Sequence, residues 1–470
     1  MFSFLRKLWQ NKRGNALMIA GAMLPLVVGA AGLATDTIQW TMWKRQLQRA
    51  ADSAAIAGVY TRQAANGATT GVPTAVSHDL ALNDHVWMAL RSGYPQVTYP
   101  ANSGSKTNQV KVVLSIQQRL PFSSMFMPSP PIITATSTAA TVPSGGSACF
   151  EALETGSVTG LNFSGNAGVE APDCDGFSNA GGANTSVAKG SSTVTLNSVG
   201  GVGGIQQSNN FHVGSYRPYS PALTDPFANV NPDPSAMKCA QTATTTTSGG
   251  GWHWEGTGAN KVKVDDPVVT TTTYTPRALT DADNGNIANI KDQNGNTANC
   301  YSSISVASNT TLNLPSGTYY INGGDLTVQG TLNCTSCTIV LTNKDASSPI
   351  GHIKNNGNPD SKVNITAPSD SANPYKGIAI YQDRRATDCN VCNKVNGNNN
   401  SIIQGAIYFP SQEFEYNGNG TTNAICTMFV ARRLNFSGNS STTNKFAKLD
   451  NCAAYGLGGA PVILMVRLVA

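Results

Sequence analysis

The sequence predicts a mainly β protein with an N-terminal helical part: a single transmembrane helix, a small α+β domain, and a β-solenoid domain close to a right-handed parallel β-helix. Three observations predict it. Residues 14–35 carry no charge over 22 positions. Charged residues make up only 12% of the 470-residue chain, which contains 46 glycines. Finally, the second half alternates short apolar runs with Gly, Asn and Ser turns, a texture typical of β-rich proteins outside the cytosol.

The uncharged run is long enough to cross a bilayer. As a helix it spans ~33 Å, against a hydrocarbon core of ~30 Å. Four basic residues precede it, which favours a cytoplasmic N-terminus: Arg6, Lys7, Lys12 and Arg13. Pro25 sits mid-span, where a membrane helix tolerates a kink. Two alternatives stay open, a signal peptide cleaved near Gly32-x-Ala34 and a buried helix of a soluble protein.

The helix is expected to continue beyond the apolar run. One stripe at helical spacing contains Trp40, Trp43, Leu47, Ala50, Ala51, Ala54 and Gly58. The two tryptophans fit either a membrane interface or the core of the next domain. A second, shorter helix is predicted over residues 73–90, and strand-like segments follow up to residue 146.

The N-terminal segment resembles a known family. It combines an Arg-Gly entry, a central Leu-Pro, an acidic exit residue and a Leu-Gln-x-Ala-Ala-Asp-x-Ala-Ala pattern. The residues that carry the pattern are Arg13, Gly14, Leu24, Pro25, Asp36, Leu47, Gln48, Ala50, Ala51, Asp52, Ala54 and Ala55. This pattern is similar to that of TadG-like proteins of the Tad (Flp) pilus assembly system, strongly over about the first 60 residues. The resemblance implies a bacterial inner-membrane protein with its bulk in the periplasm.

The resemblance sets the expected domain borders and processing. Residues 1–36 are expected to form a cytoplasmic tip and membrane anchor that includes Gly14, Pro25 and Asp36, and residues 37–146 a pilin-like α+β membrane-proximal domain. Pilins cut by prepilin peptidase generally carry Glu five residues after the cleavage glycine, and that position is Ile19 here. We therefore expect an uncut, permanent anchor.

Residues 147–470 are predicted to form the β-rich domain. The hexapeptide LNFSGN occurs twice, at 161–166 and 434–439, and residues 311–344 show short alternating strands between turns. Strands this short need neighbouring coils to bury a core, which favours a solenoid. A β-sandwich is the main alternative. A Pro/Thr-rich insertion is expected at about 216–299.

The ten cysteines all lie at or beyond residue 149, which indicates disulfides in an oxidising compartment. Proximity favours Cys149–Cys174 and Cys426–Cys452. Two CxxC pairs, Cys334/Cys337 and Cys389/Cys392, are also expected to be disulfides; as four thiolates they have the spacing of a zinc site. A redox CxxC is a third interpretation.

No catalytic motif stands out. Asp265, Asp266, Asp383, Arg384 and Arg385 form no set like that of polygalacturonase-like β-helix enzymes, and the GHIK at 351–354 is only a fragment of one. Asp360 and the His253 of GWHWEG are interpreted as solvated or packing residues. We therefore expect no enzyme, no cofactor, and no nucleic-acid partner, because the net charge of +5 forms no basic stripe.

The expected function is that of a structural or accessory component of Tad pilus assembly. The protein would be a single-pass inner-membrane protein, with its bulk in the periplasm or at the cell surface. Its expected partners are the inner membrane, other pilus-assembly subunits, and a glycan or outer-membrane component. The alternatives are a carbohydrate-acting β-helix enzyme and a surface adhesin.

Overall fold

The structure is a computed structural model of the chain that describes residues 12–82, 89–356, 361–390, 392–396, 401–417, 421–424, 426–438, 441–444, 452–457 and 462–469. The predicted cytoplasmic tip before residue 12 and the loop acid Asp360 lie outside these ranges. Contacts divide the chain into two compact units: unit 1 comprises Met1–Pro143 and Leu464–Ala470, and unit 2 comprises Ser144–Ile463. The chain therefore leaves unit 1, builds unit 2 and returns to unit 1.

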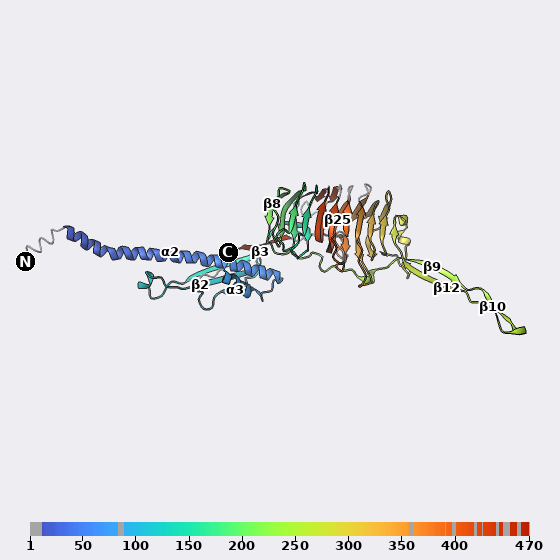
Figure 1. Cartoon of the computed structure of the whole chain (residues 1–470), viewed down its shortest axis with the longest axis horizontal. Helices are drawn as coiled ribbons and strands as arrows, with labels where there is room; N and C mark the ends of the chain where they lie inside the picture. The colour runs from blue at the N-terminus through green and yellow to red at the C-terminus, as the bar shows by residue number, and fades with distance from the viewer. Residues whose placement is uncertain are drawn as a thin grey trace, which may run out of the picture. The chain divides into compact units, whose positions relative to one another are not determined.

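Unit 1 is built on one long helix, α2 (Lys12–Ala64), of 53 residues that includes Pro25. Its N-terminal half is the apolar run, and its C-terminal half is rich in alanine, the best helix former. A short helix, α3 (Val72–Leu82), packs against it. The apolar run and the stripe that follows it therefore form a single continuous element (Figure 1).

The small-residue stripe of α2 packs on an antiparallel sheet. Its strands are β1 (Gln96–Thr98), β2 (Thr107–Ile116) and β3 (Ile133–Ala152), with β2 in the middle. The buried helix residues are Trp43, Leu47, Ala50, Ala51, Ala54, Ala55 and Val59, as the periodicity predicts. At Gly58 an added Cβ would lie 2.9 Å from Val110 Cγ1, so only glycine allows this approach. Trp43 is a core residue of this unit.

The C-terminal segment completes unit 1. Strand β29 (Val462–Leu468) brings Val466 against the core of this unit. The backbone N–H of Val469 donates to the carbonyl of Thr138 at 2.8 Å, and Lys106 Nζ donates to the Val469 carbonyl at 3.4 Å. Residues 464–469 thus belong with the N-terminal sheet, although they follow the whole of unit 2 in the chain.

Unit 2 consists of parallel ladders of short strands. The first ladder runs β14 (Cys300–Tyr301), β17 (Gly317–Asn322), β20 (Cys337–Thr342), β23 (Ile378–Gln382), β25 (Ile402–Asn417), β27 (Thr427–Ser437), β3, β5 (Gly168–Ser178), β7 (Thr193–Gly201) and β8 (Phe211–Arg217). The second runs β13 (Leu279–Thr280), β15 (Ile304–Val306), β18 (Leu326–Val328), β21 (Ile353–Asn356), β24 (Asn393–Asn396), β25, β27, β4 (Leu161–Phe163) and β6 (Ser186–Ala188). Two shorter ladders join β16 (Thr311–Leu314), β19 (Thr331–Cys334), β22 (Lys362–Thr366) and β25, and β26 (Thr421–Ala424), β28 (Ser441–Asn444), β5, β7 and β8. The strands stand side by side in Figure 1.

The spatial order of the strands differs from their order in the chain. Strand β27 pairs with β25 and also with β3 and β4, so the segment after residue 147 is added beyond the last C-terminal strands. The two copies of LNFSGN meet at this junction in register, Leu161 against Leu434 and Phe163 against Phe436. Asn162 Nδ2 donates to Asn435 Oδ1 at 2.8 Å, and the two phenylalanine rings stack at 5.3 Å.

Equivalent side chains also stack elsewhere along the ladders. Asn333 Nδ2 donates to Asn313 Oδ1 at 2.8 Å, and Asn364 Nδ2 donates to Asn333 Oδ1 at 2.9 Å. In-register parallel strands place identical side chains one above the other, which makes such asparagine ladders possible. Inside, apolar residues at every second position form one continuous core, with stacked rings such as Phe150 on Phe429 at 5.4 Å.

A long ribbon leaves unit 2 within the predicted insertion. Strands β9 (Gln241–Ser248) and β12 (Val269–Pro276) pair antiparallel, and a second hairpin, β10 (Trp252–Glu255) with β11 (Val262–Asp265), follows at its far end (Figure 1). Nearly every residue of the four strands is exposed. The Cys239–Cys300 disulfide closes the excursion near its base.

The structure confirms a mainly β protein with an N-terminal apolar helix. The β-solenoid and the pilin-like character of the first domain stay predictions. The β-sandwich alternative calls for antiparallel sheets, whereas the ladders that enclose the core of unit 2 are parallel and its described antiparallel strand pairs belong to the exposed ribbon.

Candidate functional site

The apolar half of α2 exposes its side chains. One helix, α2, is long and apolar enough over Gly21–Ala64 to cross a membrane, by length and composition. Leu24, Leu26 and Val27 are 65%, 67% and 61% exposed. A buried helix of a soluble protein would cover these groups, whereas here they are exposed. Water solvates such a surface poorly, and a lipid bilayer accommodates it.

The three predicted anchor residues occupy different surroundings. Gly14 and Pro25 lie within α2, on the apolar run. Asp36 is buried at 3% exposure, and its Oδ2 accepts a hydrogen bond of 2.6 Å from the backbone N–H of Ser123. Asp36, the acidic residue at the end of the apolar run, is therefore a hydrogen-bond acceptor that fixes the connection between β2 and β3 to the helix. The local sequence does not indicate this role.

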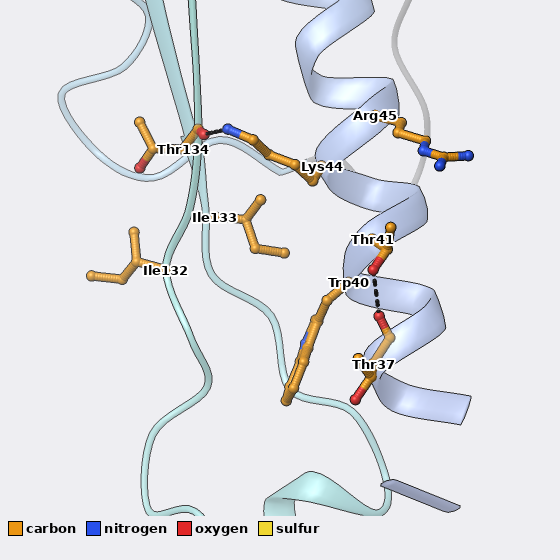
Figure 2. Close-up of a pocket in the computed structure, with 8 residues that line it drawn as sticks. All are labelled: Thr37, Trp40, Thr41, Lys44, Arg45, Ile132, Ile133 and Thr134. Atoms are coloured by element: carbon orange, nitrogen blue, oxygen red, sulfur yellow. Dashed lines mark hydrogen bonds between the residues drawn. The ribbon is translucent and has the colours of Figure 1, made fainter. Parts of the chain in front are cut away.

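A groove lies just beyond the apolar run (Figure 2). Its volume is ≈ 680 Å³, and its walls are Thr37, Trp40, Thr41, Lys44 and Arg45 of α2 with Ile132, Ile133 and Thr134 at the start of β3. Lys44 Nζ donates to the Thr134 carbonyl, which ties the helix to the strand. An indole and two cations next to an apolar span are the groups that favour the membrane–water interface.

All ten cysteines form disulfides. Cys149 pairs with Cys174 and Cys426 with Cys452, the pairs favoured by proximity, and Cys239 pairs with Cys300, which the sequence reasoning did not single out. Each CxxC closes on itself, Cys334 with Cys337 and Cys389 with Cys392. Their four sulfurs are therefore not thiolates, and the geometry is not that of a zinc site.

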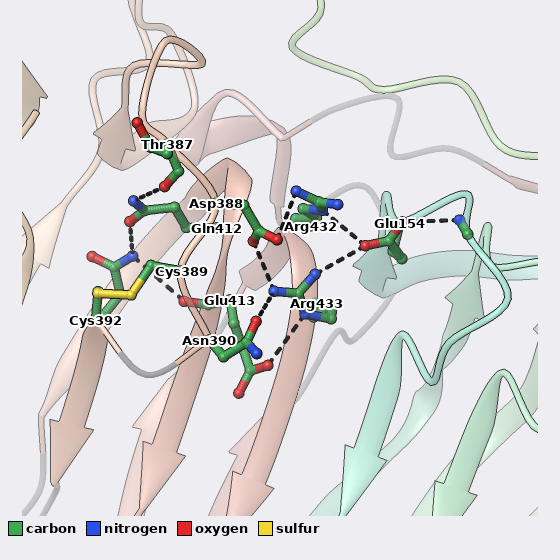
Figure 3. Close-up of polar contacts among 12 residues, drawn as sticks. Glu154, Thr387, Asp388, Cys389, Asn390, Cys392, Gln412, Glu413, Arg432 and Arg433 are labelled. Carbon is green, nitrogen blue, oxygen red and sulfur yellow. Dashed lines mark hydrogen bonds and ion pairs between the residues drawn. A yellow bond between two sulfur atoms is a disulfide. The ribbon is translucent and has the colours of Figure 1, made fainter.

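A charged cluster joins the loops at the β27 junction in unit 2 (Figure 3). Arg433 of β27 contacts Glu154 at 2.9 Å, Glu413 at 3.3 Å and Asp388 at 2.8 Å. Arg432 contacts Glu154 at 2.8 Å and Asp388 at 3.0 Å. Two adjacent arginines thus bridge three segments that are distant in the chain, beside the Cys389–Cys392 disulfide.

The pKa values of the two glutamates in this cluster are shifted in opposite directions. Burial disfavours the charge of Glu154, but the Gly156 backbone amide and the guanidinium groups outweigh it, so the pKa of Glu154 is lowered. Burial dominates at Glu413 despite its contact with Arg433, so the pKa of Glu413 is raised. Each carboxylate accepts from an arginine, an arrangement that fixes loops rather than presenting a free base.

The acids considered for an enzyme do not converge. Asp383 contacts Arg385 at 2.7 Å and Thr342 Oγ1 at 2.7 Å next to β23, whereas Asp265 and Asp266 lie on the ribbon. Asp266 Oδ1 lies 2.6 Å from His253 Nδ1. Within the described ranges, no group of three or more His, Cys, Asp or Glu side chains is arranged to hold a metal ion.

The outer hairpin of the ribbon carries an aromatic cluster. Trp252 and Trp254 of β10 are 52% and 55% exposed, with their rings 5.6 Å apart. Lys263 Nζ lies 4.7 Å from the centre of the Trp252 ring. Exposed indoles are unusual on a surface without a partner, so this cluster is a candidate binding surface.

The comparisons with known proteins place the N-terminal segment. Residues 14–66 match a family model described as "Putative Flp pilus-assembly TadE/G-like". The match covers the apolar run, Asp36 and the buried stripe, so this segment is similar to TadE/G-like proteins of Flp pilus assembly. The family model confirms, over this segment, the resemblance to TadG-like proteins of the Tad (Flp) pilus assembly system that the sequence indicates. No curated protein and no solved structure matches the chain.

Proposed function

We propose that this protein is a non-enzymatic, membrane-anchored envelope component of Tad pilus assembly. The family match over residues 14–66 carries the proposal. The exposed apolar half of helix α2 supports anchoring in a membrane. The buried stripe on the other half of α2 supports a folded membrane-proximal domain on the same helix. The N-terminus lies in the cytoplasm, as the basic residues before Gly14 favour, and the bulk of the chain lies beyond the membrane.

Unit 2 serves in this proposal as a β-solenoid that presents a long face to a partner. The parallel ladders, the asparagine stacks and the single elongated core support a solenoid. Its right-handed sense follows the usual handedness of parallel crossovers. The five disulfides suit an oxidising compartment such as the periplasm.

Deletion of the gene and complementation test the assembly role. We expect deletion cells to lose Tad filaments and the full chain to restore them. A chain in which residues 14–35 are replaced by an unrelated anchor of equal length separates anchoring from specific docking. Small residues let helices approach closely in lipid, so loss of filaments with this chimera would indicate that the native span contacts other subunits. Normal filaments in the deletion strain contradict the proposal.

The mass of the mature protein tests the anchor. A start at Met1 or Phe2 indicates an uncut anchor, a start at Asn15 a processed pilin, and a start at Thr35 a cleaved signal peptide. The protein should also resist extraction from membranes by carbonate. The enzyme alternative requires sugar release from a polysaccharide that ends when Asp265, Asp266 or Asp383 is changed to Asn.

The aromatic hairpin favours adhesion as a second function. Two exposed indoles and Lys263 share one face of a ribbon that projects from unit 2 (Figure 1). A Trp252→Ala/Trp254→Ala variant should leave cells piliated but reduce their attachment. Tyr274→Ala is the matched control, because Tyr274 is an equally exposed aromatic (53%) on the stem of the ribbon. Equal attachment of both variants contradicts the adhesive role.

A further inference from the structure

The connection between β2 and β3 is an uncharged, largely apolar loop. From Leu120 to Ile133 it contains no charged residue, and it includes Pro121, Pro128, Pro130 and Pro131. Met125, Phe126 and Met127 are 76%, 66% and 40% exposed. Three adjacent exposed apolar side chains at the tip of one loop carry a cost in water that a soluble domain normally avoids.

The loop is fixed to the apolar half of α2. A Cβ added at Gly32 would lie 2.1 Å from Phe122 Cδ1, so the ring occupies the space that glycine leaves open. Four residues further on, Asp36 accepts from the backbone N–H of Ser123 at 2.6 Å, and both residues are 3% exposed. Gln117 Nε2 and Arg119 donate to the carbonyls of Pro130 and Pro128, which closes the base of the loop.

These contacts fix the position of the loop along helix α2, and therefore its depth relative to a membrane that α2 crosses. Gly32 lies 18 residues beyond Gly14, the start of the uncharged run, which corresponds to ~27 Å along a helix. A hydrocarbon core of ~30 Å that begins at Gly14 therefore ends close to Gly32. The ring of Phe122 is seated at this level, and Figure 1 shows the β2–β3 connection running beside α2.

We propose that residues 120–132 form a second membrane contact, a wedge whose Met125–Met127 tip enters the outer surface of the same bilayer that α2 crosses. This inference rests on the proposed anchor. Continuity with the exposed face of the span favours lipid over a protein partner. The wedge and the helix together would hold unit 1 at a fixed height and rotation.

Site-directed spin labelling of the full chain tests the wedge. The described cysteines are all in disulfides, so each single cysteine variant has one reactive thiol. The variants are Met125→Cys in the tip, Val27→Cys in the span and Leu82→Cys at the end of α3. Leu82 is the matched control, because it is 74% exposed and Met125 is 76% exposed. The protein is placed in nanodiscs of phosphatidylcholine and phosphatidylglycerol, and collision with oxygen and with a water-soluble nickel chelate is measured.

The label at Met125 should resemble that at Val27, with oxygen accessible and the nickel chelate reduced several-fold relative to Leu82. A nickel accessibility at Met125 equal to that at Leu82, with Val27 in lipid, overturns the wedge and leaves the anchor intact. A label at Met125 that is shielded from both reagents indicates a protein contact and also overturns the wedge. Aqueous labels at both Val27 and Met125 overturn the anchor itself.

Discussion

Removal of the Cys149–Cys174 disulfide should lower the free energy of unfolding clearly more than removal of the Cys334–Cys337 disulfide. The Cys149–Cys174 bond closes a loop with a sequence separation of 25 residues, whereas Cys334–Cys337 closes one with a separation of 3. All four cysteines are at most 3% exposed, so alanine substitution removes two buried sulfurs in either pair. The packing losses are therefore matched, and the difference between the two double variants reports loop closure.

The chain-entropy relation gives the size of that difference. It assigns about 3.5 kcal/mol to the bond with a separation of 25 residues and about 1.6 kcal/mol to the bond with a separation of 3. The Cys149→Ala/Cys174→Ala variant should therefore unfold about 2 kcal/mol more easily than the Cys334→Ala/Cys337→Ala variant.

Urea titration of the full chain in detergent micelles, without reductant, measures this difference through near-UV circular dichroism. The slope of the unfolding free energy against urea must be compared between the variants, since a changed slope signals a changed unfolded state. Equal midpoints and equal slopes for the two variants would refute the reasoning. The bonds would then stabilise unit 2 through local packing rather than through the unfolded chain.

Three further outcomes are expected. Burial raises the pKa of Glu151 well above its usual 4.5, and neither carboxylate oxygen has a hydrogen-bond partner among the described residues. Between 4.5 and the raised pKa, the folded protein therefore holds a proton on Glu151 that the unfolded chain loses. The free energy of unfolding should therefore fall as pH rises from about 4.5 through the folded pKa. Glu151→Gln should abolish this fall and be more stable than the wild type at pH 8 in calorimetry. Arg433→Ala should lower the free energy of unfolding by about 3 kcal/mol, because it leaves Glu154 and Glu413 without this partner. Arg277→Ala, at a more exposed ion pair, should lower it by less than about 1 kcal/mol. Similar losses of unfolding free energy for the two variants in urea titration would contradict this. Deletion of 464–469 should speed amide exchange in β2 and β3 but not in β17 and β20, and unchanged exchange in β2 would disprove the role of this segment.

Local sequence patterns predicted helices and strands better than they predicted which distant segments those helices and strands contact. The stripe from Leu47 to Ala54 is a property of helical spacing, and the structure buries it as expected. The repeated hexapeptide indicated strands, but not that Asn162 would bond Asn435, which lies 273 residues away. Nothing in a short window encodes which parallel strands become neighbours, since each strand only supplies one face of a shared core.

The candidate site shows the same limit. The sequence located Asp36, yet its partner Ser123 lies 87 residues further on and is a backbone group, which no side-chain motif reveals. Arg432 and Arg433 are adjacent in the sequence, but their partners lie far apart in the chain, Glu154 and Asp388 in loops and Glu413 in strand β25. The Cys239–Cys300 pair was missed because the ribbon separates the two residues by 61 positions.

The return of the chain to unit 1 imposes an order on its synthesis. Residues 464–469 are made after Ser144–Ile463, and at roughly 5–20 residues per second those 320 residues take roughly 16–64 s. During that interval Thr138 of β3 has no Val469 to bond, so the sheet of unit 1 keeps an open edge while the larger unit is built. Completion of the first domain is thus a late event, timed by the length of the second.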